Sequence, residues 1–346
     1  MANINEINAH KRDALIKFDA GPHKYTCNGE SDYTSVTTWL HSHFKQFDAD
    51  GIIKKMMSNP ERWKKSPYYG KTPEEIKAGW DKNRDEAAEK GTEMHQCIER
   101  WASPPSPPSW VKTNKDLLEY NIELNAIVPD HYLDFVKDHP DLIPYRTEWM
   151  IFDEDVRIAG SIDMTGLGEN PASSASLQPP LETSVTQSIP KISSNSLGGG
   201  VVGGEAPLIL YDWKRCKEIK DTNSFGEFAL TDCIKHLPDT NFWQYSLQLN
   251  IYKAILEGKY EKKVAAMYLV CLHPNLPTYQ LLTVPDLSEE IKALFALRKR
   301  HISVSAATHV SAATHVSAAT HVSVSNEQNI KKDKKNKSIT DYFNKK

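Results

Sequence analysis

The sequence predicts an α/β protein in which a mixed β-sheet is flanked by helices. The order of the elements indicates this class: helices come first, then three strands, one helix and two further strands, as in a mixed α/β core. The expected helices are 47–58, 74–101, 114–125, 241–257 and 287–300. The expected strands are 145–152, 156–164, 208–214, 264–272 and 278–284.

The residue patterns within these segments justify the longer elements. The apolar stripe of helix 74–101 comprises Ala87, Gly91, Met94, Ile98 and Trp101, and that of helix 241–257 comprises Leu247, Ile251 and Ile255. Residues 156–164, VRIAGSIDM, alternate in character as in a strand with two unlike faces. The bulky run LILY at 208–211 is typical of a buried strand.

The composition indicates a chain with a sizeable core. At 346 residues it has room for one large domain or two ordinary ones. It has no run of about 18 apolar residues, so no membrane span is expected, and its start lacks the apolar stretch of a secretory signal. The five cysteines form no C-x-x-C pair, so we expect reduced thiols in an intracellular protein.

The chain is expected to have three parts. Residues 1–20 are an N-terminal extension, 21–300 the folded domain and 301–346 a flexible tail. Inside the domain, 169–206 contains no aromatic residue and is rich in Ser, Pro and Gly, so it cannot bury enough apolar surface to offset its ordering entropy. We expect a disordered insertion between two strands of one sheet; a linker between domains is the alternative.

The tail is of low complexity and basic. SAATHV occurs three times in residues 305–322, which favours a flexible tether over a metal site formed by the repeated histidines. Residues 331–346 carry seven lysines and two aspartates, or +5, so the net charge of −3 leaves −8 on the rest. An acidic body argues against DNA binding by bulk charge, but it allows a local basic groove with metal ions.

An acid and a base end the strand 208–214. Because residues two apart share one face of a strand, Asp212 and Lys214 emerge together. A carboxylate there can hold a divalent cation, and an ammonium beside it can orient a water molecule or stabilise charge on a phosphate. Magnesium takes several oxygen ligands, and the two preceding strands supply Asp163 and Glu148.

Two helices add polar residues. His95 borders the apolar stripe of helix 74–101, where it is either a core histidine or a catalytic one. Gln248 and Tyr252, four residues apart, share one face of helix 241–257, which by itself reads as an ordinary amphipathic helix.

Taken in this order, the residues resemble the PD-(D/E)xK nuclease superfamily in its RecB-like branch. The matching motifs are His95, GSID at 160–163, DWK at 212–214 and QLNIY at 248–252, and the resemblance covers roughly residues 20–285. YTSVTTWL at 33–40 and KGTEMH are similar to the mitochondrial genome maintenance exonuclease group and its viral relatives. The resemblance implies a restriction-endonuclease-like core and metal-dependent cleavage of DNA phosphodiesters, often from single-stranded ends.

The resemblance also implies roles for these residues. The implied metal ligands are His95, Asp163, Asp212 and, less specifically, Glu148, with the Trp213 carbonyl as a further ligand. The implied catalytic residues are Asp163, Asp212 and Lys214, with Gln248 and Tyr252 orienting the site. The implied cofactor is Mg²⁺ or Mn²⁺, which lowers the pKa of the attacking water.

No iron–sulfur cluster is expected. RecB-like nucleases that carry such a cluster place three of its four cysteines after the Gln-x-x-x-Tyr helix, whereas only Cys271 follows Tyr252 in this chain.

A basic and aromatic segment precedes the helix of His95. Residues 54–71 carry six basic residues against Glu61, and the expected DNA-binding residues there are Arg62, Trp63, Lys64, Lys65, Tyr68 and Tyr69. Basic groups follow a DNA backbone while aromatic faces stack on unpaired bases. The segment therefore favours single-stranded DNA, with a solvated helix end over buried aromatics as the alternative.

The end of the tail, NKSITDYF at 336–343, resembles the peptide that binds the PCNA sliding clamp. Ile339, Tyr342 and Phe343 fill its hydrophobic positions at i, i+3 and i+4. Asn336 stands where Gln is usual. A lysine-rich tail without a partner is the alternative; the flanking lysines also suit nuclear import or DNA contact.

These features together predict a metal-dependent DNA exonuclease that prefers single-stranded ends. A PCNA-type clamp would recruit it to replication, repair or recombination, in the nucleus or at a viral replication site. A structure-specific endonuclease acting on flaps or branches is one alternative. A catalytically silent DNA-binding adaptor is another, against which the intact Asp163, Asp212 and Lys214 argue.

Overall fold

The structure is a computed structural model that describes residues 2–167, 206–223 and 225–317, with side chains described up to residue 304. The expected insertion 169–206 therefore lies almost wholly outside the described residues. The clamp-binding motif at 336–343, with Asn336, Ile339, Tyr342 and Phe343, lies outside them too.

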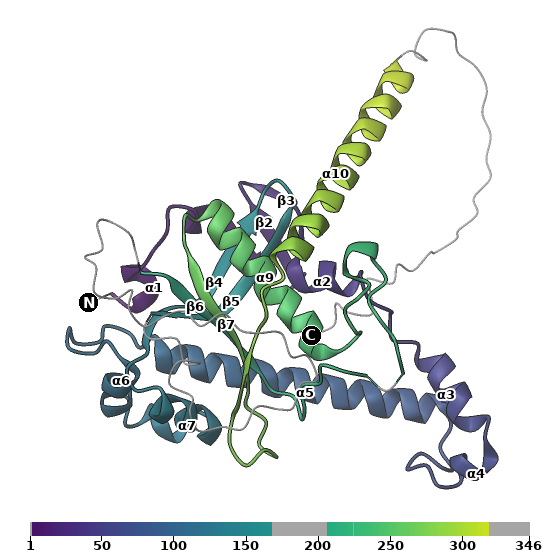
Figure 1. Cartoon of the computed structure of the whole chain (residues 1–346), viewed down its shortest axis with the longest axis horizontal. Coiled ribbons are helices and arrows are strands. Elements are labelled where there is room, and N and C mark those ends of the chain that lie inside the picture. Colours follow the sequence, from purple (N-terminus) through teal and green to yellow (C-terminus); the bar gives the residue numbers. More distant parts are fainter. Residues whose placement is uncertain (1, 168–205, 224, 318–346) are drawn as a thin grey trace, which may run out of the picture.

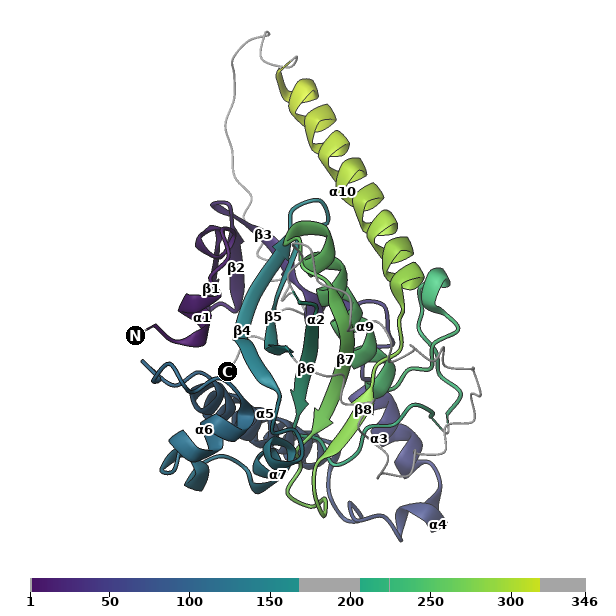
Figure 2. The ribbon, with the colours of Figure 1, turned by 60° about the vertical axis from the view of Figure 1, so that its left-hand side comes forward.

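A mixed sheet forms the centre of the protein (Figures 1 and 2), and within the described residues it has eight strands. They are β1 (Ile16–Asp19), β2 (Lys24–Cys27), β3 (Glu30–Ser35), β4 (Ile143–Asp153), β5 (Ile158–Leu167), β6 (Leu208–Lys214), β7 (Val264–Cys271) and β8 (Gln280–Thr283). The order is β1-β2-β3-β5-β6-β7-β8, with β4 also paired to β5. The pairs β3–β5 and β6–β7 are parallel and the others antiparallel, which confirms the expected mixed sheet.

Helices cover both faces of this sheet. The α-helices of the described residues are α1 (Ile4–Ile7), α2 (Val36–His41), α3 (Ala49–Met57), α4 (Pro60–Trp63), α5 (Pro73–Ala102), α6 (Asn114–Tyr120), α7 (Asp130–Asp138), α9 (Asn241–Lys259) and α10 (Ser288–Ser317). On one face α2, α9 and α10 pack on Leu208 and Leu210 of β6. On the other face α5, α6 and α7 pack on Ile209, Tyr211 and Trp213. Burial on both faces explains the continuous apolar run at the start of β6.

The ten expected elements are all present, but β4 starts two residues earlier than predicted, β8 is shorter, and the helix expected at 114–125 ends at Tyr120. The hairpin strands β1–β3 and the helices α1, α2, α4 and α7 were not predicted. The first 20 residues are not a separate extension, because β1 belongs to the sheet. Asp13 also accepts hydrogen bonds from Arg146 Nη1 at 2.6 Å and Trp149 Nε1 at 3.0 Å, both on β4.

The start of the tail also differs from the expectation. Residues 301–317 were expected to be flexible, but α10 continues through them and includes the first two SAATHV repeats. Alanine is the best helix former and occurs twice in each repeat. In Figure 1 this helix projects away from the sheet.

Candidate active site

The candidate site forms where β5 and β6 stop pairing. The two strands pair from Met164 to Gly166 of β5, and on the same edge β3 pairs only with Ile158 and Ala159. Residues 160–163 of β5 therefore have no strand on this side. The Asp163 carboxylate takes the place of the next ladder bond, because its Oδ2 accepts from the Trp213 N–H at 2.8 Å.

Gly160 lets helix α9 approach the gap. A Cβ atom added at Gly160 would lie 2.7 Å from Cε1 and 3.0 Å from Oη of Tyr252, closer than any side chain tolerates. The close neighbour that the missing side chain at Gly160 admits is Tyr252. The Gln248 Nε2 group lies 3.2 Å from the Tyr252 hydroxyl oxygen and 3.3 Å from Asp212 Oδ1.

Three side chains from different elements form a group of potential metal ligands. One ligand atom each of His95 on α5, Glu148 on β4 and Asp163 on β5 lies within 4.8 Å of the others. The His95 Nδ1 atom is 3.6 Å from both Glu148 Oε1 and Asp163 Oδ2. Its Nε2 atom is 3.0 Å from the Trp213 carbonyl oxygen. Since a carbonyl only accepts, Nε2 carries the proton and Nδ1 faces the carboxylates.

Glu148 is held in a rare backbone conformation. Its φ angle is +45°, which is uncommon for a residue other than glycine and costs about 1–3 kcal/mol. The Ser161 hydroxyl on the neighbouring strand donates to Glu148 Oε2 at 3.1 Å. Strain of this kind in the middle of a long strand is typical of functional sites, because the surrounding structure must hold it.

Beside this group lies the ion pair of Asp212 and Lys214. The Lys214 Nζ atom is 2.6 Å from Asp212 Oδ2 and 4.4 Å from the centre of the Tyr245 ring on α9. The Lys214 side chain is 17% exposed and that of Asp212 only 2%, so both charges depend on each other for solvation. Asp212 is therefore bound by Lys214 and Gln248, and it is not a member of the three-residue ligand group.

The electrostatics of the site follow from burial and from these pairs. Burial lowers the pKa of His95, but Asp163 and Glu148 outweigh it and raise that pKa to about 9. Burial raises the pKa of Asp212 to about 6, although Lys214 opposes this, and it also raises the pKa of Asp163. Near neutral pH His95 is therefore a positive imidazolium in the metal-free site, and a divalent cation can take the place of its proton.

The structure thus brings together the seven expected residues His95, Glu148, Asp163, Asp212, Lys214, Gln248 and Tyr252. The Trp213 carbonyl, expected as a ligand, instead fixes the ring of His95. The hydrogen bond from Ser161 to Glu148 and the contact of Lys214 with Tyr245 were not predicted from the sequence. Ser161 lies inside the GSID motif, and Tyr245 lies one turn before Gln248 on the same helix.

A cavity of about 420 Å³ opens onto the ligand group. It lies between α5 and β4 and is lined by Ala88, Gly91, Thr92, His95, Gln96, Glu99 and Glu148. Small residues at 88 and 91 leave space above His95, and a Cβ atom at Gly91 would meet nothing within 4 Å. The group is therefore open to an extended ligand from the α5 side.

The expected DNA-binding residues Arg62, Trp63, Lys64, Lys65, Tyr68 and Tyr69 lie away from this cavity. They belong to α4 and the turn after it, and Figure 1 shows this segment at the start of α5. The Tyr68 hydroxyl accepts from Trp80 Nε1 of α5 at 2.8 Å. Trp80 precedes His95 by 15 residues, so at 1.5 Å per residue the segment lies about 22 Å along α5 from the site.

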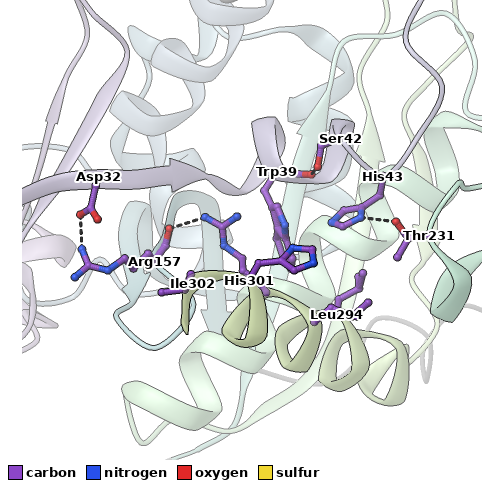
Figure 3. Close-up of a pocket in the computed structure, with 11 residues that line it drawn as sticks. Asp32, Trp39, Ser42, His43, Arg157, Thr231, Leu294, His301 and Ile302 are labelled. Atoms are coloured by element: carbon purple, nitrogen blue, oxygen red, sulfur yellow. Dashed lines mark hydrogen bonds and ion pairs between the residues drawn. The ribbon is translucent and has the colours of Figure 1, made fainter. Parts of the chain in front are cut away.

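A larger cavity, of about 820 Å³, lies between α2, α10 and residue 231 (Figure 3). Several of its polar groups are engaged with one another or with nearby residues. Asp32 pairs with Arg157, the His43 Nδ1 atom is 2.7 Å from Thr231 Oγ1, and Arg298 donates to the Arg157 carbonyl at 3.1 Å. We find no acid–base group there comparable to that around His95.

Comparison with known proteins adds no assignment: no family model matches the chain, and neither does any curated protein. In the part of the chain that the structure describes, no helix has the length and apolar character needed to cross a membrane. The functional interpretation therefore depends on the site itself.

Proposed function

We propose that the protein is a metal-dependent DNA nuclease of the PD-(D/E)xK type. One observation carries the proposal: a His–Glu–Asp ligand group lies directly beside a buried Asp212–Lys214 pair, at the point where two strands part. The order of the motifs also supports it, since α5, β5, β6 and α9 carry His95, Asp163, Asp212 and Gln248 in the order of the superfamily resemblance.

The residues present fit a divalent metal ion. His95, Glu148 and Asp163 would hold it, with one imidazole nitrogen and two carboxylates as donors, and Mg²⁺ or Mn²⁺ suits a site with carboxylates and open positions. When bound, such an ion neutralises charge on a phosphodiester and lowers the pKa of a coordinated water. The Trp213 carbonyl keeps His95 in the tautomer that can ligate.

The remaining residues position the water and the phosphate. Lys214, held between Asp212 and the Tyr245 ring, presents its ammonium at a fixed place beside the ligand group, where it would orient the attacking water and stabilise negative charge. Gln248 bridges Asp212 and Tyr252, so α9 holds the carboxylate of this pair in place. Tyr252 itself fills the gap at Gly160.

We propose that the substrate is DNA, taken preferentially from a single-stranded end. The exposed Tyr69 and the basic residues around it would grip the strand about 22 Å from the site. Recruitment by a PCNA-type clamp through 336–343, and action in the nucleus or at a viral replication site, remain part of the proposal. They depend on the sequence motif alone.

The test compares end-labelled linear single strands, linear duplexes and covalently closed single-stranded circles, each with magnesium or with a chelator. We expect magnesium-dependent shortening of linear single strands, slower digestion of duplexes and resistant circles. Circles cut as fast as linear strands would instead support the structure-specific endonuclease. Binding without cleavage of any substrate, with either metal, would support the silent adaptor.

A further inference from the structure

Two cysteine sulfur atoms lie side by side next to the candidate site. The Sγ atoms of Cys216 and Cys271 are 3.7 Å apart, and the Cys271 thiol lies 2.9 Å from the Cys216 carbonyl oxygen. Cys271 is the last residue of β7, whereas Cys216 lies two residues beyond the end of β6. The remaining cysteines Cys27, Cys97 and Cys233 lie on other elements.

The pair is connected to Lys214 through the backbone. Lys214 is the register partner of Cys271 in the parallel ladder, and its carbonyl accepts from the Leu272 N–H at 2.8 Å. Lys214 also precedes Cys216 by two residues. A movement that joins the two sulfur atoms therefore shifts the backbone of Lys214 in two ways: through its pairing with β7 and through the loop that carries Cys216.

The geometry requires only a small movement. A disulfide has an S–S distance of about 2.05 Å, so the sulfur atoms must approach by about 1.7 Å from their separation of 3.7 Å. Cys271 is fully buried in the sheet, but Cys216 is half-buried in the loop after β6. The loop is thus the part that moves, and Cys216 gives an oxidant its access.

The pair also has the acidity that thiol oxidation needs. The hydrogen bond between the two sulfur atoms lowers the pKa of Cys271 to about 7, although burial opposes this, and it raises the pKa of Cys216. Cys271 is therefore the member of the pair that supplies the thiolate, the reactive form, while Cys216 stays a thiol.

We propose that Cys216 and Cys271 are a modification site at which a peroxide forms a reversible disulfide, and that this disulfide displaces Lys214. In the first step a thiolate of the pair attacks one oxygen of hydrogen peroxide, which gives a sulfenic acid and releases water after protonation. In the second step the other sulfur attacks the sulfenic sulfur, and a second water leaves. Two thiols are oxidised to one disulfide and one peroxide is reduced to two waters.

The pairing is tested without reference to any activity. The full chain is treated with hydrogen peroxide, free thiols are alkylated, and peptides are mapped with and without dithiothreitol. We expect one reducible cross-link, between the peptides of Cys216 and Cys271, and its absence in Cys216→Ser. Cys233→Ser is the control and should retain it. Alkylation of both Cys216 and Cys271 after peroxide treatment of the wild type would overturn the proposal.

The effect on Lys214 is tested by cleavage, and this arm rests on the proposed nuclease function. Because a displacement near 1 Å can cost about 100-fold in rate, we expect peroxide to reduce cleavage by at least about 10-fold and dithiothreitol to restore it. Cys216→Ser should stay active under the same treatment. Full activity of the cross-linked protein would refute the displacement. Absence of cleavage before oxidation would refute the nuclease instead, and the peptide map would still decide the disulfide.

Discussion

The Nε2 atom of His95 lies 3.0 Å from the carbonyl oxygen of Trp213. This contact joins α5, on one face of the sheet, to the residue between Asp212 and Lys214 on β6. The same peptide segment also donates its Trp213 N–H to Asp163. One stretch of backbone therefore orients two ligands of the candidate metal group and carries the buried ion pair on either side.

The first prediction concerns proton release on metal binding. With a pKa of about 9, His95 is protonated at pH 7.5 in the metal-free protein, and a ligating imidazole must lose that proton. Calorimetric titration with Mn²⁺ in two buffers of different ionisation enthalpy should show close to one proton released. His95→Gln should show much less release, and equal release in both proteins would contradict the assignment of His95.

The second prediction concerns stability against pH. The folded-state pKa of His95, about 9, lies above the unfolded value of about 6.5, so its contribution is complete below pH 6.5 and is lost as pH rises through 9. The metal-free wild type should lose up to about 3 kcal/mol of unfolding free energy over this window relative to His95→Gln. Denaturant titrations at several pH values measure the free energy of unfolding of both proteins. If this free energy changes equally with pH in the two proteins, the predicted contribution of His95 is ruled out.

The third prediction compares Gly160, which contacts α9, with Gly258, which lies on α9. Gly160→Ala should destabilise the protein by about 1–3 kcal/mol, because its Cβ atom would overlap the Tyr252 ring. The control is Gly258→Ala on α9, where a Cβ atom meets nothing within 4 Å. It should be neutral or stabilising by up to about 1 kcal/mol. Thermal unfolding compares them, and an unaffected Gly160→Ala would show that α9 is not in contact at this point.

The fourth prediction concerns Tyr69, the more exposed of the two tyrosines in the basic segment. Tyr69 is 56% exposed, whereas the Tyr68 hydroxyl is engaged by Trp80. Tyr69→Ala should weaken binding of single-stranded DNA by about 1–3 kcal/mol, the usual value of one base stack, with an unchanged melting temperature. Tyr120→Ala, on α6, serves as the control. Fluorescence anisotropy with a labelled oligonucleotide measures both, and equal affinities would remove Tyr69 from the interface.

Strand periodicity predicts one part of the candidate site, and the resemblance of the motifs implied the grouping of His95, Asp163, Gln248 and Tyr252 around that part. Asp212 and Lys214 share a face by their spacing alone, and Asp163 lies at the point where the neighbouring strand separates. The φ angle of Glu148 could not be predicted, because a strained backbone is imposed by tertiary packing. The separation of Asp212 from the three-residue ligand group depends equally on distances across the sheet.

The N-terminal strands were not predicted from the sequence for a different reason. KYTC of β2 and ESDYTS of β3 are short and polar, so they carry little periodic signal. They are stabilised by contacts far along the chain, since Tyr25 and Tyr33 pack in one cluster with Phe152 and Ala159. The prediction for the low-complexity repeat in α10 was wrong for another reason. The repeat was expected to be flexible because of its composition, but its alanines favour the helix that extends to Ser317.

The most direct test of the central claim is the magnesium-dependent cleavage rate of Asp163→Asn on an end-labelled linear single strand. The substitution keeps the shape of the side chain but removes one carboxylate of the ligand group, so we expect a loss of at least about 1,000-fold with a folded protein. Asp232→Asn, at a 97% exposed side chain away from the site, should cleave as the wild type does. Cleavage by Asp163→Asn within a few-fold of the wild type would contradict the metal site, and with it the proposed nuclease.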